Sequence, residues 1–131
     1  MKYILNEGKI MLEVKWTHII NGLVIAIILG LILGILTSWG DILGYLIATI
    51  YVGYSVNGDY KNGAIHGAIV GVLAALIVLI LSLLGLSALF ADVTVVSGLV
   101  AIVTVLIIAI IIGGIIGAIG GTIGVLIKSK R

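Results

Sequence analysis

The sequence predicts an all-α integral membrane protein, a bundle of four transmembrane helices arranged as two hairpins in a single domain over residues 1–131. Three observations predict this fold. Hydrophobic residues make up 63% of the chain and charged residues only 9%, so a folded soluble form would expose too much apolar surface. Four apolar runs are separated by short polar segments. The 19 glycines lie mostly inside those runs, where turns do not explain them.

The first element is a segment over residues 1–16, which we expect to be cytoplasmic or interfacial. It mixes apolar and charged residues, so it could form a short amphipathic helix on the membrane surface or a solvated tail. The first apolar run begins only after Trp16, and no Ala-x-Ala-like site follows it. We therefore expect no cleavable signal peptide and a first run that stays in the membrane.

The four apolar runs differ in length. A helix needs roughly 20 residues to cross ~30 Å of hydrocarbon. The run over 17–38 meets this requirement, whereas 41–56 crosses only if its polar ends reach the headgroups or the bilayer thins locally. The runs over 63–90 and 95–127 are longer than required. We expect each of these two to tilt, kink or extend beyond the hydrocarbon.

The basic residues predict the orientation. In the four-span topology every one of them falls on the same side, and short cytoplasmic segments collect Lys and Arg. The prediction is a multi-pass protein of the cell membrane with cytoplasmic N- and C-termini. A turn at Gly113 and Gly114 inside the fourth run would give five crossings, and it would carry the C-terminal basic residues outside. The basic residues are Lys2, Lys9, Lys15, Lys61, Lys128, Lys130 and Arg131.

Glycine spacing predicts where the helices meet, because small residues let helices approach closely in lipid. One row repeats every four residues at the start of the third run and another near the end of the fourth, at similar depth, so the two could face each other. The first hairpin carries glycines near its turn. The spacing leaves three roles open for these glycine rows: close packing within a monomer, an interface between copies of the protein, or the lining of a pore. The predicted helix-packing residues are Gly30, Gly34, Gly40, Gly44, Gly63, Gly67, Gly71, Gly113, Gly117 and Gly121, with Gly120 and Gly124 as a further pair.

A faint internal repeat relates the ends of the first and third runs by a constant shift. Two hairpins related by duplication would produce it, although three matching positions also arise by chance in a biased composition. The matched positions are Gly34, Trp39 and Asp41 in the first copy and Gly85, Phe90 and Asp92 in the second.

Ionisable groups inside a span cost about 2.5–3.5 kcal/mol at a helix centre, which makes each a candidate site. His66 lies one turn into the third run, where an imidazole can change charge near neutral pH or bind an ion. It could equally reach water or hydrogen-bond a neighbouring helix. Asp59, in the turn over 57–62, could join His66 in a cation site. The two form a possible polar or ion site, although their spacing matches no specific metal motif.

The remaining chemistry is sparse. The chain has no cysteine, and no catalytic triad, carboxylate pair, phosphate-binding loop or cofactor fingerprint appears in a consistent context. We therefore expect no enzyme, no cofactor, no metal and no nucleic-acid partner. The expected partners are membrane lipids, whose anionic headgroups suit the basic ends, and either a second copy or a larger membrane complex.

The functional prediction is a structural or accessory membrane protein that assembles through glycine-zipper helix faces. The alternative is an oligomeric ion or small-solute channel or transporter with His66 near the path. An enzyme acting on lipids ranks third, because it would need a polar cluster that the sequence lacks.

One stretch resembles a known family. The pattern Gly53-Tyr54, Gly58-Asp59-Tyr60-Lys61-x-Gly63-Ala64, Gly67-Ala68 and Gly71 is similar to the central signature of small archaeal membrane proteins of unknown function, common in methanogens. The similarity extends from the first run to the end of the fourth. It implies a four-span body in an archaeal cytoplasmic membrane and carries over no catalytic residue, ligand or partner.

Overall fold

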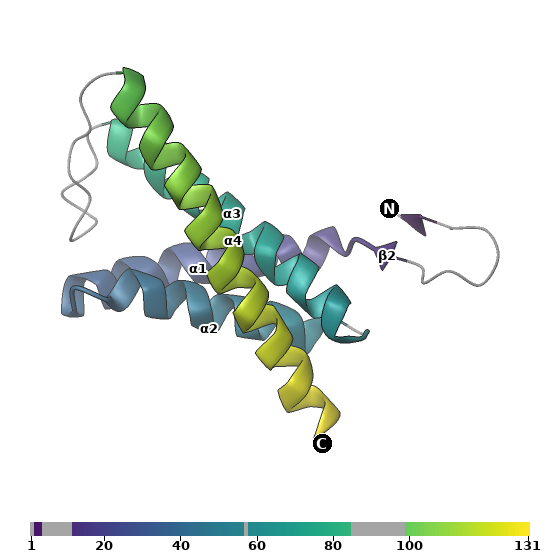
Figure 1. The fold of residues 1–131 in the computed structure, drawn as a ribbon. Coiled ribbons are helices and arrows are strands. Elements are labelled where there is room, and N and C mark those ends of the chain that lie inside the picture. The colour runs from purple at the N-terminus through teal and green to yellow at the C-terminus, as the bar shows by residue number, and fades with distance from the viewer. Residues whose placement is uncertain (1, 4–11, 57, 85–98) are drawn as a thin grey trace.

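The computed structural model describes residues 2–3, 12–56, 58–84 and 99–131. This part of the protein is helical apart from one pair of two-residue strands, which confirms the predicted all-α class with four helices (Figure 1). The elements in sequence order are β1 (Lys2–Tyr3), β2 (Leu12–Glu13), α1 (Trp16–Leu36), α2 (Gly40–Ser55), α3 (Tyr60–Leu83) and α4 (Leu99–Ser129).

Three of the helices are long and apolar enough to cross a membrane, namely α1, α3 over Tyr60–Leu81, and α4. This composition indicates a membrane protein. The fourth helix, α2, has 16 residues and is about 24 Å long at 1.5 Å per residue, less than a typical hydrocarbon core. With 31 residues, α4 reaches about 46 Å and exceeds that thickness.

The N-terminal residues that the structure describes are extended. β1 pairs antiparallel with β2, with Lys2 opposite Glu13 and Tyr3 opposite Leu12. The sequence had allowed an amphipathic helix in this segment, and that alternative is wrong for residues 2–3 and 12–13. The reason is the alternation of apolar and charged residues over 12–15, which has the period of a strand and not of a helix.

The helix ends refine the predicted boundaries. Leu36 ends α1, where the Thr37 amide donates to the Leu33 carbonyl at 2.8 Å, and three residues lead to α2. α3 begins at Tyr60, three residues before the predicted start at 63. Residues 85–98 lie outside the described residues, as do the predicted boundaries at 90 and 95 and the second copy of the proposed repeat. α4 runs unbroken through Gly113 and Gly114, so the backbone does not turn back there.

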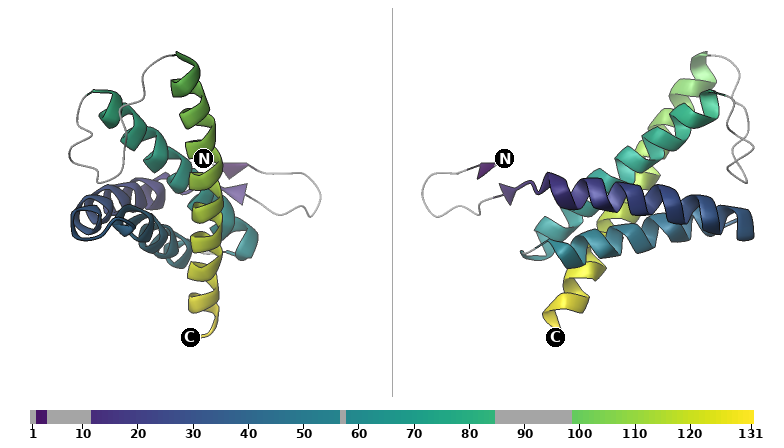
Figure 2. Two further views of the ribbon diagram at one scale, coloured as in Figure 1. Left: turned by 60° about the vertical axis from the view of Figure 1, so that its left-hand side comes forward. Right: turned by 180° about the vertical axis from the view of Figure 1, so that it is seen from behind.

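The helices pack in an oblique arrangement. α1 lies along α2, α3 lies along α4, and the second pair crosses the first, with α2 contacting both α3 and α4 (Figures 1 and 2).

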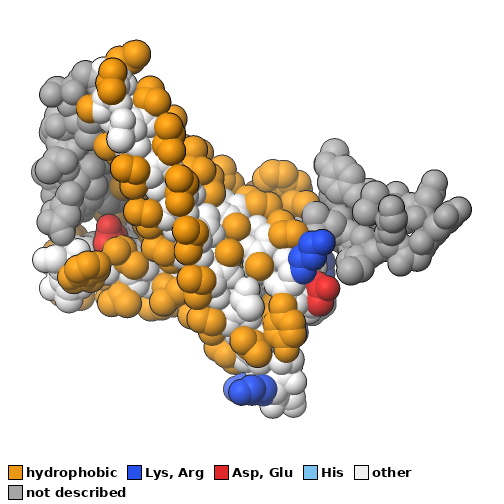
Figure 3. All heavy atoms as spheres, in the orientation of Figure 1, with side chains coloured by type: hydrophobic (Ala, Val, Ile, Leu, Met, Phe, Trp, Pro, Cys, Tyr) orange, Lys and Arg blue, Asp and Glu red, His pale blue; other side chains and the backbone are white. Residues whose placement is uncertain are grey.

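The buried side chains are mostly small. One core cluster joins Ala26, Ala48 and Ala74, and a second gathers around Ile19 and Val52. Large aliphatic side chains instead face outward over most of the visible surface (Figure 3). Small residues inside and large apolar residues outside suit a protein whose solvent is lipid.

Candidate functional site

The two predicted glycine rows of α3 and α4 lie against each other. A Cβ atom placed on Gly67 would overlap the carbonyl oxygen of Gly117, and one on Gly71 would overlap that of Gly113. One on Gly63 would lie 2.7 Å from the carbonyl oxygen of Gly121. No larger residue fits at these positions without a backbone movement, so the two helix backbones touch.

The glycines of α1 and α2 have unequal roles. A Cβ on Gly44 would lie 2.5 Å from the backbone nitrogen of Gly30, and one on Gly40 would overlap the Leu33 carbonyl. On Gly34, by contrast, a Cβ would find its nearest neighbour at 3.9 Å, and on Gly30 it would meet an aromatic ring at 3.4 Å. The close approach therefore depends on the glycines of α2, and α1 contributes the backbone against which they pack.

A third close contact joins α2 to α4, and its α2 side was not predicted from the sequence. A Cβ on Gly53 would overlap the carbonyl of Gly121, and one on Gly124 would lie 2.5 Å from the amide nitrogen of Tyr54. Gly120 faces the buried Thr49 in the same way. Thr49 and Gly53 are small residues four positions apart, a signal that was present. The spacing did not show which helix they contact.

Thr49 is satisfied within its own helix. Its hydroxyl lies 2.9 Å from the Tyr45 carbonyl and 3.0 Å from the Leu46 carbonyl, to which it donates. A hydroxyl bonded to the preceding turn needs no partner on the neighbouring helix, and the Thr49 oxygen lies directly against Gly120. Thr49 therefore acts as a packing residue against Gly120.

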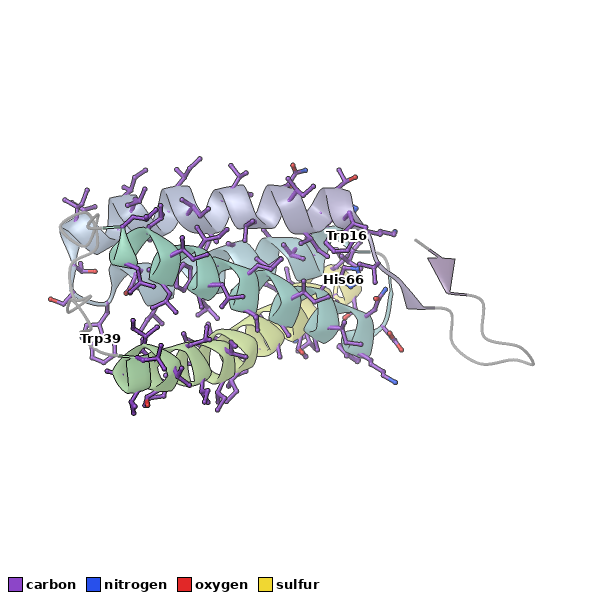
Figure 4. The ribbon with its side chains drawn as sticks, turned by 90° about the horizontal axis from the view of Figure 1, so that it is seen from above. Trp16, Trp39 and His66 are labelled. Carbon is purple, nitrogen blue, oxygen red and sulfur yellow. The ribbon has the colours of Figure 1, made fainter. Side chains whose placement is uncertain are left out.

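His66 connects α3 to the residue that precedes α1. It is fully buried, and its Nε2 accepts a hydrogen bond from the Lys15 backbone amide at 3.0 Å. Its Nδ1 lies 2.8 Å from the Asn62 carbonyl and donates to it. This hydrogen-bond network assigns the neutral tautomer with the proton on Nδ1. Figure 4 places His66 beside Trp16 at one end of the bundle and Trp39 at the other.

Asp59 caps α3. Its Oδ1 accepts the Asn62 amide at 3.2 Å and its carbonyl accepts the Gly63 amide at 3.2 Å, the geometry of an N-cap residue. Asp59 and His66 thus each bind backbone amides. Across the described ranges, no three His, Cys, Asp or Glu side chains are grouped to hold a metal ion.

Figure 3 shows two separate basic patches on this face, one of them where the C-terminus lies. The Lys128 ammonium group there lies 5.8 Å from the ring centroid of Tyr54, which places the last turn of α4 over the last turn of α2. An ammonium group over an aromatic face is a favourable cation–π arrangement.

Comparison with known proteins identifies the family. Residues 16–127 match the family model DUF5518, a family of unknown function. The chain belongs to the DUF5518 family. The DUF5518 match begins at the first residue of α1 and ends within the last turn of α4, so it contains every glycine contact described above and His66. No curated protein and no solved structure matches the sequence.

Proposed function

We propose that this DUF5518 protein is a non-enzymatic structural or accessory protein of the cell membrane, with four spans in two hairpins. The observation that carries the proposal is the use of glycine. Close contacts join α1 to α2, α3 to α4 and α2 to α4, while the large aliphatic side chains point outward. Such a body is held together by backbone approach in lipid and offers apolar faces to its surroundings.

Both termini lie in the cytoplasm in this proposal. The charge pattern supports this orientation, because Lys15, Lys61 and Lys128 all lie at one end of the helices. α2 crosses with Asp41 and Ser55 drawn toward the two headgroup regions. The resemblance of the Gly-Asp-Tyr-Lys region supports an archaeal cytoplasmic membrane as the location.

Assembly is proposed to use the outward faces and not the glycine rows. The glycine zippers that the sequence suggested for assembly are occupied by contacts within the protein. Only 6% of the 18-residue apolar stretch of α4 is buried within the protein. Exposed isoleucines such as Ile107, Ile111 and Ile115 can therefore contact a second copy or another membrane subunit.

His66 supports the structural role over the channel alternative. A histidine that lines an ion path needs a ring nitrogen directed at the path. Here one ring nitrogen receives the Lys15 amide and the other donates to the Asn62 carbonyl. His66 therefore acts as an anchor for the start of α1.

The test is to count copies in vesicles by stepwise photobleaching and to measure ion flux from the same vesicles. We expect more than one copy per complex and no flux. Ile111→Ser should lower the copy number, whereas Ile28→Ser on the outward face of α1 should leave it unchanged. A steady flux that His66→Ala abolishes would contradict the proposal and restore the channel alternative.

A further inference from the structure

The two helix pairs diverge away from their glycine contacts. The close contacts of α2 with α4 involve the second half of α2, from Thr49, and the last part of α4, from Gly120. Toward the start of α2 the pairs separate (Figure 2). A cleft of about 270 Å³ lies there, bounded by the first turns of α2, the second half of α3 and the middle of α4.

Among the residues that the structure describes, the lining of this cleft is apolar with two polar side chains. Ala75 and Leu79 of α3 and Ala109 and Ile112 of α4 line the cleft. The two alanine side chains are too small to fill the space between the helices. A volume near 300 Å³ is at the lower limit of small-molecule sites, which suits a slender hydrocarbon tail better than a bulky solute. The cleft therefore has the size and chemistry for one lipid tail.

The two polar residues among the described lining are Asp41 and Tyr45, one turn apart on α2. Asp41 also borders a second hollow of about 270 Å³ beside Ser38 and Trp39, so its carboxylate lies between an apolar cleft and the headgroup end of the helix. Its Oδ1 accepts the Ile42 amide at 2.8 Å, which orients the carboxylate at the start of α2. The basic residues that the structure describes lie at the other end of the helices.

We propose that this cleft binds one membrane lipid with an ammonium headgroup. One hydrocarbon tail of the lipid lies along Ala75 and Ala109, and the ammonium group lies beside Asp41 in the hollow next to Trp39. Charge complementarity selects this occupant, because an acidic group at the mouth of an apolar cleft attracts a cationic headgroup and disfavours an anionic one. The site adds a specific ligand to the structural role and requires only that the protein is inserted in a bilayer.

The two tryptophans make the site measurable. Trp39 is 71% exposed beside the proposed headgroup position, and Trp16 lies at the far end of α1. In the full-length protein with Trp16→Phe, Trp39 is the single tryptophan, and Trp39→Phe gives the matched control with Trp16 alone. Each protein is reconstituted into phosphatidylglycerol vesicles, whose headgroup carries no ammonium group, with a small fraction of either phosphatidylethanolamine or phosphatidylglycerol brominated close to the glycerol end of its tails. Fluorescence quenching reports local lipid occupancy.

The expected result is a preference of about fivefold in apparent affinity of the Trp39 site for brominated phosphatidylethanolamine over phosphatidylglycerol, the ratio that one partly exposed ion pair supports. Asp41→Asn should remove the preference and Asp41→Glu should restore it, while Ala109→Phe should reduce quenching by both lipids. The Trp16 control should not favour phosphatidylethanolamine.

Equal quenching of Trp39 by the two lipids, or a preference that Asp41→Asn leaves intact, would overturn the lipid site. Quenching that decreases as the protein-to-lipid ratio rises would overturn it in favour of a second copy in the cleft. Absence of quenching by any brominated lipid would instead contradict membrane insertion. The two failures are therefore distinguishable, and a helical circular dichroism spectrum for each variant excludes misfolding as their cause.

Discussion

Gly67→Ala should destabilise the protein although alanine is the better helix former. A Cβ at this position would overlap the Gly117 carbonyl oxygen and lie 2.9 Å from the Cα of Gly121. Both neighbours are backbone atoms, so no side-chain rotation relieves the overlap. Restoring ordinary contact requires α3 and α4 to separate by roughly 1 Å, and gaps of that size forfeit a quarter to a half of each dispersion contact.

The magnitude follows from two opposing effects. Alanine in place of glycine favours a helix by about 1 kcal/mol. Forcing an added methyl group into a packed interface costs about 1–3 kcal/mol, and here the loss extends to the neighbouring pairs Gly63–Gly121 and Gly71–Gly113. We expect a net loss of about 1–2 kcal/mol in the free energy of unfolding for Gly67→Ala, and a larger loss for Gly67→Leu.

Gly114→Ala is the matched control, because it lies on the same helix pair and its Cβ would meet a methyl group of Val72 at an ordinary 3.5 Å. It should be neutral or stabilising by up to about 1 kcal/mol. The assay is reversible unfolding in mixed micelles of increasing dodecyl sulfate fraction, followed by helical circular dichroism. If Gly67→Ala and Gly114→Ala unfold at the same dodecyl sulfate fraction, the backbone contact of α3 with α4 is refuted.

Three further predictions are tested by the same unfolding assay. His66→Ala should cost about 2 kcal/mol, because it empties the buried site of the imidazole and removes the acceptor of the partly buried Lys15 amide. It should also speed proteolysis just before α1, and unchanged proteolysis would argue against the anchor. Asp59→Ala should cost about 1 kcal/mol and Asp59→Asn much less, as expected for an N-cap, and equal losses would point to a role for the charge. Gly120→Ala should destabilise in the wild-type background and much less when combined with Thr49→Ala, and strict additivity would mean that the two sites are not in contact.

Much of the helical framework could be predicted from the sequence. Long apolar runs demand helices in lipid, because every backbone amide must be satisfied inside its own segment. Glycine spacing indicated the two rows of α3 and α4, since residues four apart share a helix face. Gly67 and Gly117 belong to these rows and lie in contact.

The remaining features depend on partners that spacing does not encode. The contact of Gly53 with Gly121 requires the angle at which the second helix pair crosses the first. The acceptor role of His66 could not be foreseen either, because its partner is the backbone amide of Lys15 and carries no side-chain signature. Asp59 could have been assigned as an N-cap only if the third helix had been predicted to begin at Tyr60 and not at residue 63.

The four-span topology is tested most directly by the accessibility of single introduced cysteines to a labelling reagent outside the cell. The sequence has no cysteine of its own, so each label reports one position. Ser38→Cys, Lys61→Cys and Ser129→Cys replace exposed residues near three helix ends. In intact cells a membrane-impermeant maleimide should label Ser38→Cys alone, and the other two should react only after lysis. Labelling of Lys61→Cys from outside would show that α2 does not cross, and labelling of Ser129→Cys from outside would contradict the cytoplasmic C-terminus.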